Sequence, residues 1–334
     1  MKALLFRGAS QPIQVTNVPK PDINKGQVLI RVKYAALNHL DLLIMRKVED
    51  VTNGSVILGS DGAGVIEAVG EGVNKLFVGQ EVLINPALNW GDELKAHGPD
   101  FEILGYPDNG TFAEYIVIDQ KQVFPKPSHL TLQEAAAIPM AGLTAYRVLF
   151  TRGKLEKGQN VLVTGAGGGV GQFLLQFAIA AGANVYVTSG SNEKLAFMSR
   201  QGVIKGFNYK DETWANAAKA AVPDGFDLIV DSAGGEAFLS LIDLTKTGGT
   251  IVIFGRTAGN IPPIYPGLLY NKQINILATI MGSSSEFGSM LNFYETNRIR
   301  PVIDQTFSLD EYDHAFRKME EGKHLGKILF EIQD

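Results

Sequence analysis

The chain has 334 residues, of which 45% are hydrophobic and 19% are charged, which is typical of a soluble protein of about two domains and excludes a disordered chain. Its formal net charge of -5 gives no overall basic surface, so we expect no nucleic-acid partner. The absence of cysteine excludes disulfides, thiolate metal ligands and a cysteine nucleophile, and it fits the reducing environment of a cytoplasmic protein.

Residues 1–124 predict a β-rich, barrel-like domain, because short apolar runs alternate there with glycine, proline and asparagine. The apolar run at the N-terminus is followed at once by polar residues and Pro12, so we interpret it as a first strand and not as a signal peptide. No stretch approaches the run of about 18 apolar residues that a membrane span requires. We therefore expect no membrane association.

Residues 125–266 predict a doubly wound parallel sheet of the Rossmann type. Strand-like and helix-like segments alternate there; the strands are expected at 160–165, 184–189, 204–209, 226–232 and 249–255, and the helices at 172–182, 192–202, 213–222 and 235–248. Residues 267–334 hold two further helices and a final strand. Because roughly 65 residues make only a marginal core alone, we expect this tail to return to the first domain.

The run GAGGGVG at 165–171 raises the question of a phosphate-bearing ligand. It follows a predicted strand and precedes a predicted helix, and the spacing Ala166-x-Gly168-x-x-Gly171 is close to the dinucleotide fingerprint. Gly168 allows the backbone to approach a pyrophosphate, and Gly171 allows the helix to pack on the strand. A purely structural turn is the alternative, but the strand and helix context favours dinucleotide binding.

The end of the second strand of this domain indicates which dinucleotide is bound. A carboxylate is expected there for the ribose of NAD, but Thr188 and Ser189 occupy the position and Lys194 follows. Hydroxyls and a cation suit a 2′-phosphate, so we predict NADP(H). The alternative is that the serines only cap the next helix and that Lys194 is a solvated side chain. We assign nearby Glu193 to the helix dipole.

At this point the chain resembles the medium-chain dehydrogenase/reductases, in particular the zinc-free quinone oxidoreductase-like, alcohol dehydrogenase-like members. The motifs that carry the resemblance lie at 35–46, 59–82, 135–149, 161–172, 227–235 and 326–332. The resemblance implies a GroES-like catalytic domain, 1–124 completed by 267–334, beside an NADP-binding Rossmann domain, 125–266, with the cofactor in the cleft. The cofactor-binding residues that it implies are Ala166, Gly168, Gly169, Val170, Gly171, Ser189, Lys194, Tyr209, Phe254, Gly255 and Met281.

The resemblance also allows a test for catalytic zinc, which takes three cysteine, histidine or carboxylate ligands. Where the zinc-dependent members have a cysteine, this chain has Asn38. Their histidine and acid correspond to Ser60 and Asp61, and their third ligand lies close to Met140 or Ala141. These positions do not offer a good ligand set, so we expect no metal.

Without a metal to polarise oxygen, we expect hydride transfer to an electron-poor acceptor, a quinone or an α,β-unsaturated carbonyl. Asn38 is the candidate donor to the developing oxyanion and Thr144 is the next. Asp41 and Arg46 would organise the substrate-side loop. The alternatives are that Asn38 caps the helix that follows it and that Asp41 pairs with Arg46.

Two other functions stay open at the level of the sequence. One is an NADPH-binding relative with a regulatory or structural role, and the other is a metal-dependent alcohol or aldehyde dehydrogenase with an unfamiliar site. The run YNKQINILATI at 270–280 resembles the edge strand through which the family pairs its sheets. Because an exposed apolar edge would otherwise promote aggregation, we expect a homodimer.

Overall fold

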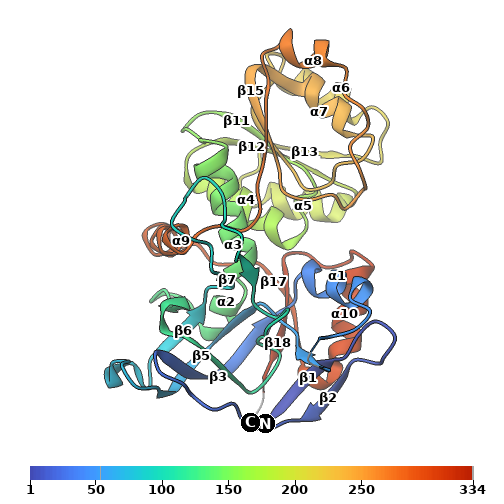
Figure 1. Cartoon of the computed structure of the whole chain (residues 1–334). Coiled ribbons are helices and arrows are strands. Elements are labelled where there is room, and N and C mark those ends of the chain that lie inside the picture. The colour runs from blue at the N-terminus through green and yellow to red at the C-terminus, as the bar shows by residue number, and fades with distance from the viewer. Residues whose placement is uncertain (53, 333–334) are drawn as a thin grey trace. The chain divides into compact units, whose positions relative to one another are not determined.

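The computed structural model describes residues 1–52 and 54–332 (Figure 1). The chain forms two compact units: unit 1 consists of Met1–Leu143 and Gly282–Asp334, and unit 2 consists of Thr144–Met281. Among the described residues, none of the helices combines the length and the apolar character that a membrane span needs.

Unit 1 contains a mixed sheet with strand order β10-β6-β5-β3-β18-β17, in which β9 also pairs with β3, a smaller sheet of order β2-β1-β4, and the pair β7-β8. The strands are β1 (Lys2–Phe6), β2 (Gln14–Asn17), β3 (Gln27–Ala36), β4 (Val56–Ile57), β5 (Asp61–Val69), β6 (Glu81–Ile84), β7 (Ala87–Leu88), β8 (Glu102–Ile103), β9 (Tyr115–Asp119), β10 (Val123–Pro125), β17 (Ile303–Ser308) and β18 (Lys327–Glu331). The helical elements are α1 (His39–Lys47), η1 (Lys75–Phe77), η2 (Gln120–Gln122), α2 (Leu132–Ala136), α9 (Ser284–Asn297), η4 (Leu309–Glu311) and α10 (Tyr312–Glu320).

Strand β3 is the centre of unit 1. Its alternating sequence buries Val28, Ile30 and Val32 in the core, while Arg31 and Lys33 are only half-buried, as the two-residue repeat of a strand requires. Near its carboxyl end, Ala36 is paired on one side with Asp61 at the start of β5 and on the other side with Leu329 of β18. Three chain segments that are far apart in sequence therefore meet at this end of the sheet.

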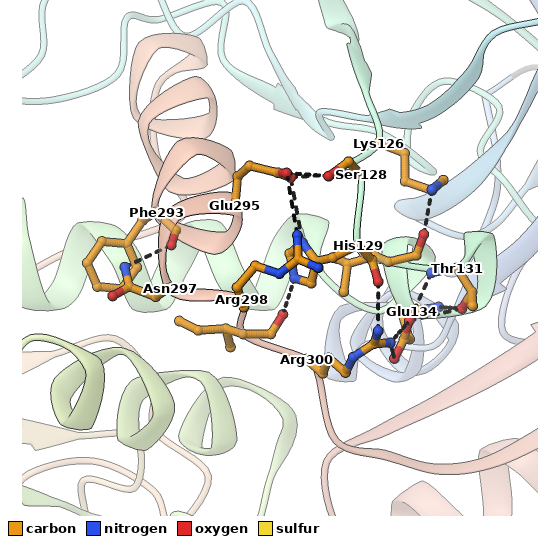
Figure 2. A network of polar contacts seen from close by, with 12 residues as sticks. Lys126, Ser128, His129, Thr131, Glu134, Phe293, Glu295, Asn297, Arg298 and Arg300 are labelled. Atoms are coloured by element: carbon orange, nitrogen blue, oxygen red, sulfur yellow. Dashed lines mark hydrogen bonds and ion pairs between the residues drawn. The ribbon is translucent and has the colours of Figure 1, made fainter.

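The C-terminal segment is tied into unit 1 by a network of polar contacts around His129 (Figure 2). His129 Nε2 lies 2.8 Å from the carbonyl oxygen of Ile299, and the backbone N–H of Ser128 donates to Glu295 at 2.8 Å. Arg300 donates to both carboxylate oxygens of Glu134, at 2.6 and 2.7 Å. These contacts join the end of α9 to the segment that enters α2.

Unit 2 is a parallel sheet with strand order β13-β12-β11-β14-β15-β16, which is the doubly wound order with its switch point between the first and fourth strands. The strands are β11 (Asn160–Val163), β12 (Asn184–Ser189), β13 (Lys205–Asn208), β14 (Phe226–Asp231), β15 (Thr245–Ile253) and β16 (Asn275–Ala278). The helices are α4 (Gly169–Ala180), α5 (Asn192–Ser199), α6 (Trp214–Ala221), α7 (Phe238–Leu244) and α8 (Pro266–Tyr270). The predicted fold class is confirmed: a Rossmann-type sheet accompanies a β-rich, GroES-like unit.

The boundaries between the units differ from those that the proline-rich junctions suggest. The division falls after Leu143, inside α3 (Pro139–Tyr146), and again after Met281, and not after residues 124 and 266. The first difference arises because Ala137, directly after α2, packs with Ala36 and Leu329 in unit 1. The second arises because β16 pairs with β15 and completes the sheet of unit 2. The proline-rich stretches at 125–127 and 262–266 therefore lie within the units and not between them.

One local expectation for unit 2 also needs correction. The helix expected at 235–248 is shorter, because α7 ends at Leu244 and β15 already begins at Thr245. The β-branched threonines of this stretch favour the extended chain. In addition, α3 continues into a π-helical turn, η3 (Arg147–Arg152), a rare form for which the sequence carries no simple signal.

Candidate functional site

The glycine run lies between β11 and α4. The backbone N–H of Ala166 donates to the carbonyl of Thr188 at 3.1 Å, which fixes the loop against the neighbouring strand. A Cβ added at Gly171 would lie 2.6 Å from the Cα of Ala166, far inside van der Waals contact. Only glycine therefore permits the close approach of the helix to the loop at this position.

Gly168, by contrast, leaves open space. A Cβ added there would have Gly165 O as its nearest neighbour, at 3.9 Å, and the backbone at Gly168 is extended, with φ of -79° and ψ of 173°. Gly168 is the N-cap of α4, and no side chain of the described residues caps this helix. There is thus room beside Gly168 at the start of α4, and uncapped amide groups and the positive dipole end of a helix favour an anion.

Lys194 lies beside this loop. A Cβ at Gly167 would be 2.7 Å from Lys194 Cδ and 3.6 Å from Nζ, so the lysine side chain extends along the glycine run. Ser191 caps α5 by accepting from the backbone N–H of Lys194 at 3.3 Å, and Ser189 Oγ accepts from the N–H of Ser191 at 3.3 Å. Both hydroxyl oxygens thus accept backbone hydrogen bonds, and a hydroxyl that accepts in this way can still donate its own proton to a phosphate.

Tyr209 stands next to the same turn. Its hydroxyl would lie 2.6 Å from a Cβ at Gly190, and the residue is 51% exposed. Ser189, Lys194 and Tyr209 therefore lie close to the turn at the end of β12. The cluster carries hydroxyls and one cation, and Glu193 occupies the first turn of α5, where a carboxylate interacts favourably with the helix dipole.

The adjoining turn after β14 is fixed by a buried carboxylate. Asp231 accepts from Thr164 Oγ1 at 2.7 Å and from the backbone N–H of Gly234 at 2.8 Å. Nearby, a Cβ at Gly255 would lie 2.5 Å from the carbonyl oxygen of Ser232. Glycine at 255 therefore lets two successive turns at the carboxyl edge of the sheet pack together.

Phe254 and Gly255 line a pocket of about 390 Å³ inside unit 2, together with Arg256, Asn260 and Thr279. Two of the residues that the resemblance implies for cofactor binding therefore share one concave surface at the ends of β15 and β16.

Two further expected residues are neighbours at the ends of the unit 2 segment. Thr144 Oγ1 lies 4.0 Å from Met281 Sδ, and both side chains are buried. Behind the pocket, Arg147 is buried and donates to Thr279 Oγ1 at 2.9 Å. Sequence reasoning did not select Arg147, because a buried arginine is not distinguished in sequence from an exposed one.

In unit 1 the three segments that meet at the end of β3 bring together Asn38, Asp61 and Lys327, which we call the buried triad. The ammonium of Lys327 donates to Asn38 Oδ1 at 2.6 Å, to Asp61 Oδ2 at 2.9 Å and to the carbonyl of Leu37 at 3.0 Å. Asn38 Nδ2 donates to Asp61 Oδ2 at 2.9 Å, and Asp61 Oδ1 accepts from the N–H of Met140 at 2.7 Å. Lys327 and Asp61 are only 3% and 0% exposed in their side chains.

Lys327 is the functional candidate that sequence reasoning missed. The signal was its place in the GK pair at the start of a final apolar strand, where a lysine would have to be buried among strand neighbours. A buried lysine requires a charged partner, and Asp61 is the acid at the start of the neighbouring motif. The pairing itself depends on strand order, which the sequence does not state.

Asp41 belongs to the cap of α1. Asn38 is the N-cap residue, and its backbone N–H donates to Asp41 Oδ2 at 2.8 Å. Arg46 does not pair with Asp41; it donates to Glu320 at 2.8 Å. Asn38 therefore occupies the N-cap position of α1, and the carboxylate of Asp41 accepts its backbone N–H. The expected pairing of Asp41 with Arg46 is wrong, because Arg46 instead joins α1 to α10.

The pKa of Asp41 is raised to about 7, mainly by burial and also by the nearby carboxylate of Asp61. Hydrogen bonds from the backbone of Asn38 and Gly59 and the charge of Lys327 oppose this rise. Asp41 Oδ1 is buried without a hydrogen-bond partner among the described residues. The carboxyl group therefore changes its charge near neutral pH.

The groups that correspond to the zinc ligands of the zinc-dependent relatives do not fit that metal. Asn38 and Ser60 offer neutral oxygens, and the oxygens of Asn38 and Asp61 already bind the ammonium of Lys327. Throughout residues 1–52 and 54–332, no group of three or more histidine, cysteine, aspartate or glutamate side chains could hold a metal ion. Ser60 Oγ is buried and has no hydrogen-bond partner within the described structure.

Two family models match the chain. An alcohol dehydrogenase GroES-like domain matches residues 24–128, and a zinc-binding dehydrogenase matches residues 169–296. The first lies within unit 1, and the second covers most of unit 2.

Similar proteins cover nearly the whole chain. The zinc-type alcohol dehydrogenase-like protein YogA of Leptosphaeria maculans is 33% identical, over 96% of this chain and 95% of the relative. The 2-methylene-furan-3-one reductase of Solanum lycopersicum is also 33% identical, over 94% of this chain and 74% of the relative. A crystal structure of an NAD-dependent alcohol dehydrogenase matches with a TM-score of 0.93 and 33% identity, over 100% of both chains.

Proposed function

Because the chain belongs to the medium-chain dehydrogenase/reductase superfamily of oxidoreductases, we propose that it transfers a hydride from NADPH to an α,β-unsaturated carbonyl or a quinone without a metal ion. The observation that carries the proposal is the buried triad. Its oxygens surround a lysine ammonium, so they are not available to zinc. Without that Lewis acid, the acceptor must already be electron-poor.

The nature of one relative supports this choice of acceptor. The tomato protein is named for a 2-methylene-furan-3-one, a ketone conjugated to an exocyclic double bond. Addition of a hydride to such a double bond moves negative charge onto the carbonyl oxygen, which one hydrogen-bond donor can stabilise. We prefer a small enone to a thioester and keep quinones as the second acceptor class.

The residues around the glycine loop support NADPH as the donor. The amides at the start of α4 would bind the pyrophosphate, and the open space at Gly168 leaves room for it. Ser189 and Lys194 would bind the 2′-phosphate, because the end of β12 carries hydroxyls and a cation in place of the acid that binds an unmodified ribose. When bound, the nicotinamide supplies the hydride.

The remaining roles fall to residues of the described chain. Asn38 would donate a hydrogen bond to the substrate oxygen, and Asp41 would hold the cap of α1 on which Asn38 lies. Thr144, buried beside Met281, would order the substrate side of unit 2. Protonation of the product would come from solvent.

We also propose a homodimer that pairs through β16. This strand is the last in the order of its sheet, and the exposed Tyr270 and Ile280 flank it. An unpaired edge with apolar neighbours favours pairing with a second copy. Light scattering coupled to gel filtration measures the mass, and a monomer at all concentrations would contradict the proposal.

The test of the reaction is NADPH oxidation by protein treated with chelator, with but-3-en-2-one, 9,10-phenanthrenequinone and a simple aldehyde as acceptors. NADH is tested as the competing hydride donor, because one structural relative is an NAD-dependent alcohol dehydrogenase. We expect turnover of the enone or the quinone with NADPH preferred. Activity only on the aldehyde and only after addition of zinc would contradict metal-free transfer. Tight NADPH binding without turnover of any acceptor would favour a non-catalytic role.

A further inference from the structure

Lys327 occupies an unusual position for a lysine. It is the first residue of β18, it pairs with Ile303 of β17, and its side chain is buried. Its three ammonium protons have three oxygen partners, two of them from the triad and one from the backbone of Leu37. A buried ammonium costs free energy unless it is fully hydrogen-bonded and paired. The ammonium of Lys327 is fully hydrogen-bonded and paired with Asp61, and one of its partners is the neutral amide of Asn38.

The contacts of Lys327 and Asp61 determine the orientation of the Asn38 amide. Lys327 binds its oxygen at 2.6 Å, and Asp61 binds its nitrogen at 2.9 Å. The flipped amide would place N–H groups against the ammonium and an oxygen against the carboxylate, so both contacts would become repulsive. The two charges therefore fix the amide in one orientation.

In this orientation, one of the two Nδ2–H groups of Asn38 makes only a long hydrogen bond. The second contact of Nδ2 is with the carbonyl of Ala36 at 3.5 Å, which is at the limit of hydrogen-bond distance. Next to the triad, the buried hydroxyl of Ser60 also has no partner among the described residues. Buried polar groups normally find partners, so two groups at this end of the sheet are suited to an oxygen supplied by a ligand.

We propose that Lys327 is a positioning residue, whose buried ammonium orients and polarises the Asn38 amide so that its second Nδ2–H donates to the substrate oxygen. The inference rests on the proposed function. During reduction of an enone, the hydride of NADPH forms a C–H bond at the β carbon and leaves NADP⁺. The π pair of the C=C bond becomes the new double bond between the α carbon and the carbonyl carbon, and the π pair of the carbonyl moves onto its oxygen. The resulting enolate takes a proton from solvent at the α carbon. The ammonium of Lys327 acts while negative charge develops on the carbonyl oxygen, because it orients and polarises the Asn38 amide that donates to this oxygen.

The variant that tests this role is Lys327→Ala, with n-propylammonium as the probe, because that cation replaces the atoms lost beyond Cβ. We expect kcat for the enone to fall at least about tenfold with little change in the Kd of NADPH. Added n-propylammonium should raise both Tm and kcat, whereas n-propanol, which has no charge, should raise neither. Lys323→Ala is the matched control, since Lys323 is 73% exposed and pairs with Glu321.

A second variant covers the case in which Lys327→Ala does not fold. The double substitution Asp61→Asn with Lys327→Met removes both buried charges, and pairs removed together are often tolerated. We expect a folded protein with low kcat and no response to n-propylammonium. A kcat within twofold of wild type would overturn the proposal. Recovery of Tm without recovery of kcat in Lys327→Ala would overturn it as well, because Lys327 would then be structural only.

A spectroscopic readout separates this inference from the proposed function. The side-chain amide signals of Asn38, identified by their loss in Asn38→Asp, should shift on Lys327→Ala or on the double substitution, and n-propylammonium should restore them in the former. If the wild-type enzyme reduces no acceptor, the proposed function fails. The amide signals of Asn38 then still test whether Lys327 orients this side chain. Signals that remain unchanged on removal of the ammonium would overturn the role of Lys327 whatever the activity.

Discussion

The buried triad of unit 1 and the glycine loop of unit 2 differ in whether their polar groups have hydrogen-bond partners within the chain. In the triad, the ammonium of Lys327 and the carboxylate of Asp61 find all their partners inside the chain. In the glycine loop, the start of α4 has no side-chain cap from the described residues, and Gly168 leaves open space. The difference is that the start of α4 leaves room for a group from outside the chain, whereas the oxygens of the buried triad are already occupied by an ammonium from the chain itself.

The largest effect is expected when the triad loses its anion. Asp61→Ala would leave Lys327 charged, buried and without its carboxylate, so we expect the free energy of unfolding to fall by about 3–5 kcal/mol. Urea unfolding followed by circular dichroism measures the loss. In the double variant Asp61→Asn, Lys327→Met, most of this stability should return. A cost below about 1 kcal/mol for Asp61→Ala would show that the triad tolerates an unpaired charge.

The second effect concerns Asp41, whose pKa is raised by burial from 3.8 to about 7. The folded state therefore holds a proton that the unfolded state has lost, and stability must fall as the pH rises between these values. The fall is up to about 4 kcal/mol. Asp41→Asn, which can accept the same backbone hydrogen bonds, should remove this fall and unfold at higher temperature than wild type at pH 8.

Thermal unfolding of Asp41→Asn and wild type between pH 5 and pH 8 checks this prediction. Asp313→Asn is the control, because Asp313 is 51% exposed on α10 and its loss should not alter the slope. If wild type and Asp41→Asn show parallel pH dependence, Asp41 is charged in the fold throughout this range. A second charged carboxylate, that of Asp41, would then be buried beside the triad without a full set of partners among the described residues. The triad would differ less from the glycine loop, where the start of α4 also lacks a side-chain cap from the described chain.

The third effect compares two glycines of one loop. Gly171→Ala places a Cβ 2.6 Å from backbone atoms of Ala166 that cannot move aside, so we expect a loss of about 1–3 kcal/mol in stability. Gly168→Ala has room for its Cβ and should unfold like wild type, but it should bind NADPH at least about tenfold more weakly. Calorimetry on both variants separates the two roles. Equal NADPH affinity in Gly168→Ala and wild type would show that the open space is not the phosphate site.

The sequence predicted unit 2 better than unit 1 for a physical reason. The strands and the glycine run of unit 2 are local patterns, and parallel order follows from the alternation of strands and helices. The triad depends on which strands become neighbours: Asn38, Asp61 and Lys327 meet because β5 and β18 flank β3. Sequence reasoning found Asn38 and the acid beside Ser60, but it could not place Lys327 next to them.

The smallest effect concerns the choice of nucleotide. Lys194 extends along the glycine run from the first turn of α5, where its charge can reach a phosphate. If that phosphate is the 2′-phosphate, Lys194→Ala should raise the Kd of NADPH about tenfold, or about 1.4 kcal/mol, and leave that of NADH unchanged. Lys205→Ala, at the exposed start of β13, should affect neither. An equal loss for both nucleotides would instead assign Lys194 to the pyrophosphate, because both nucleotides share that group. In that case the nucleotide preference would depend on the hydroxyls at the end of β12. The glycine loop would still be the place where the chain leaves room for a phosphate, in contrast to the triad, whose oxygens are occupied.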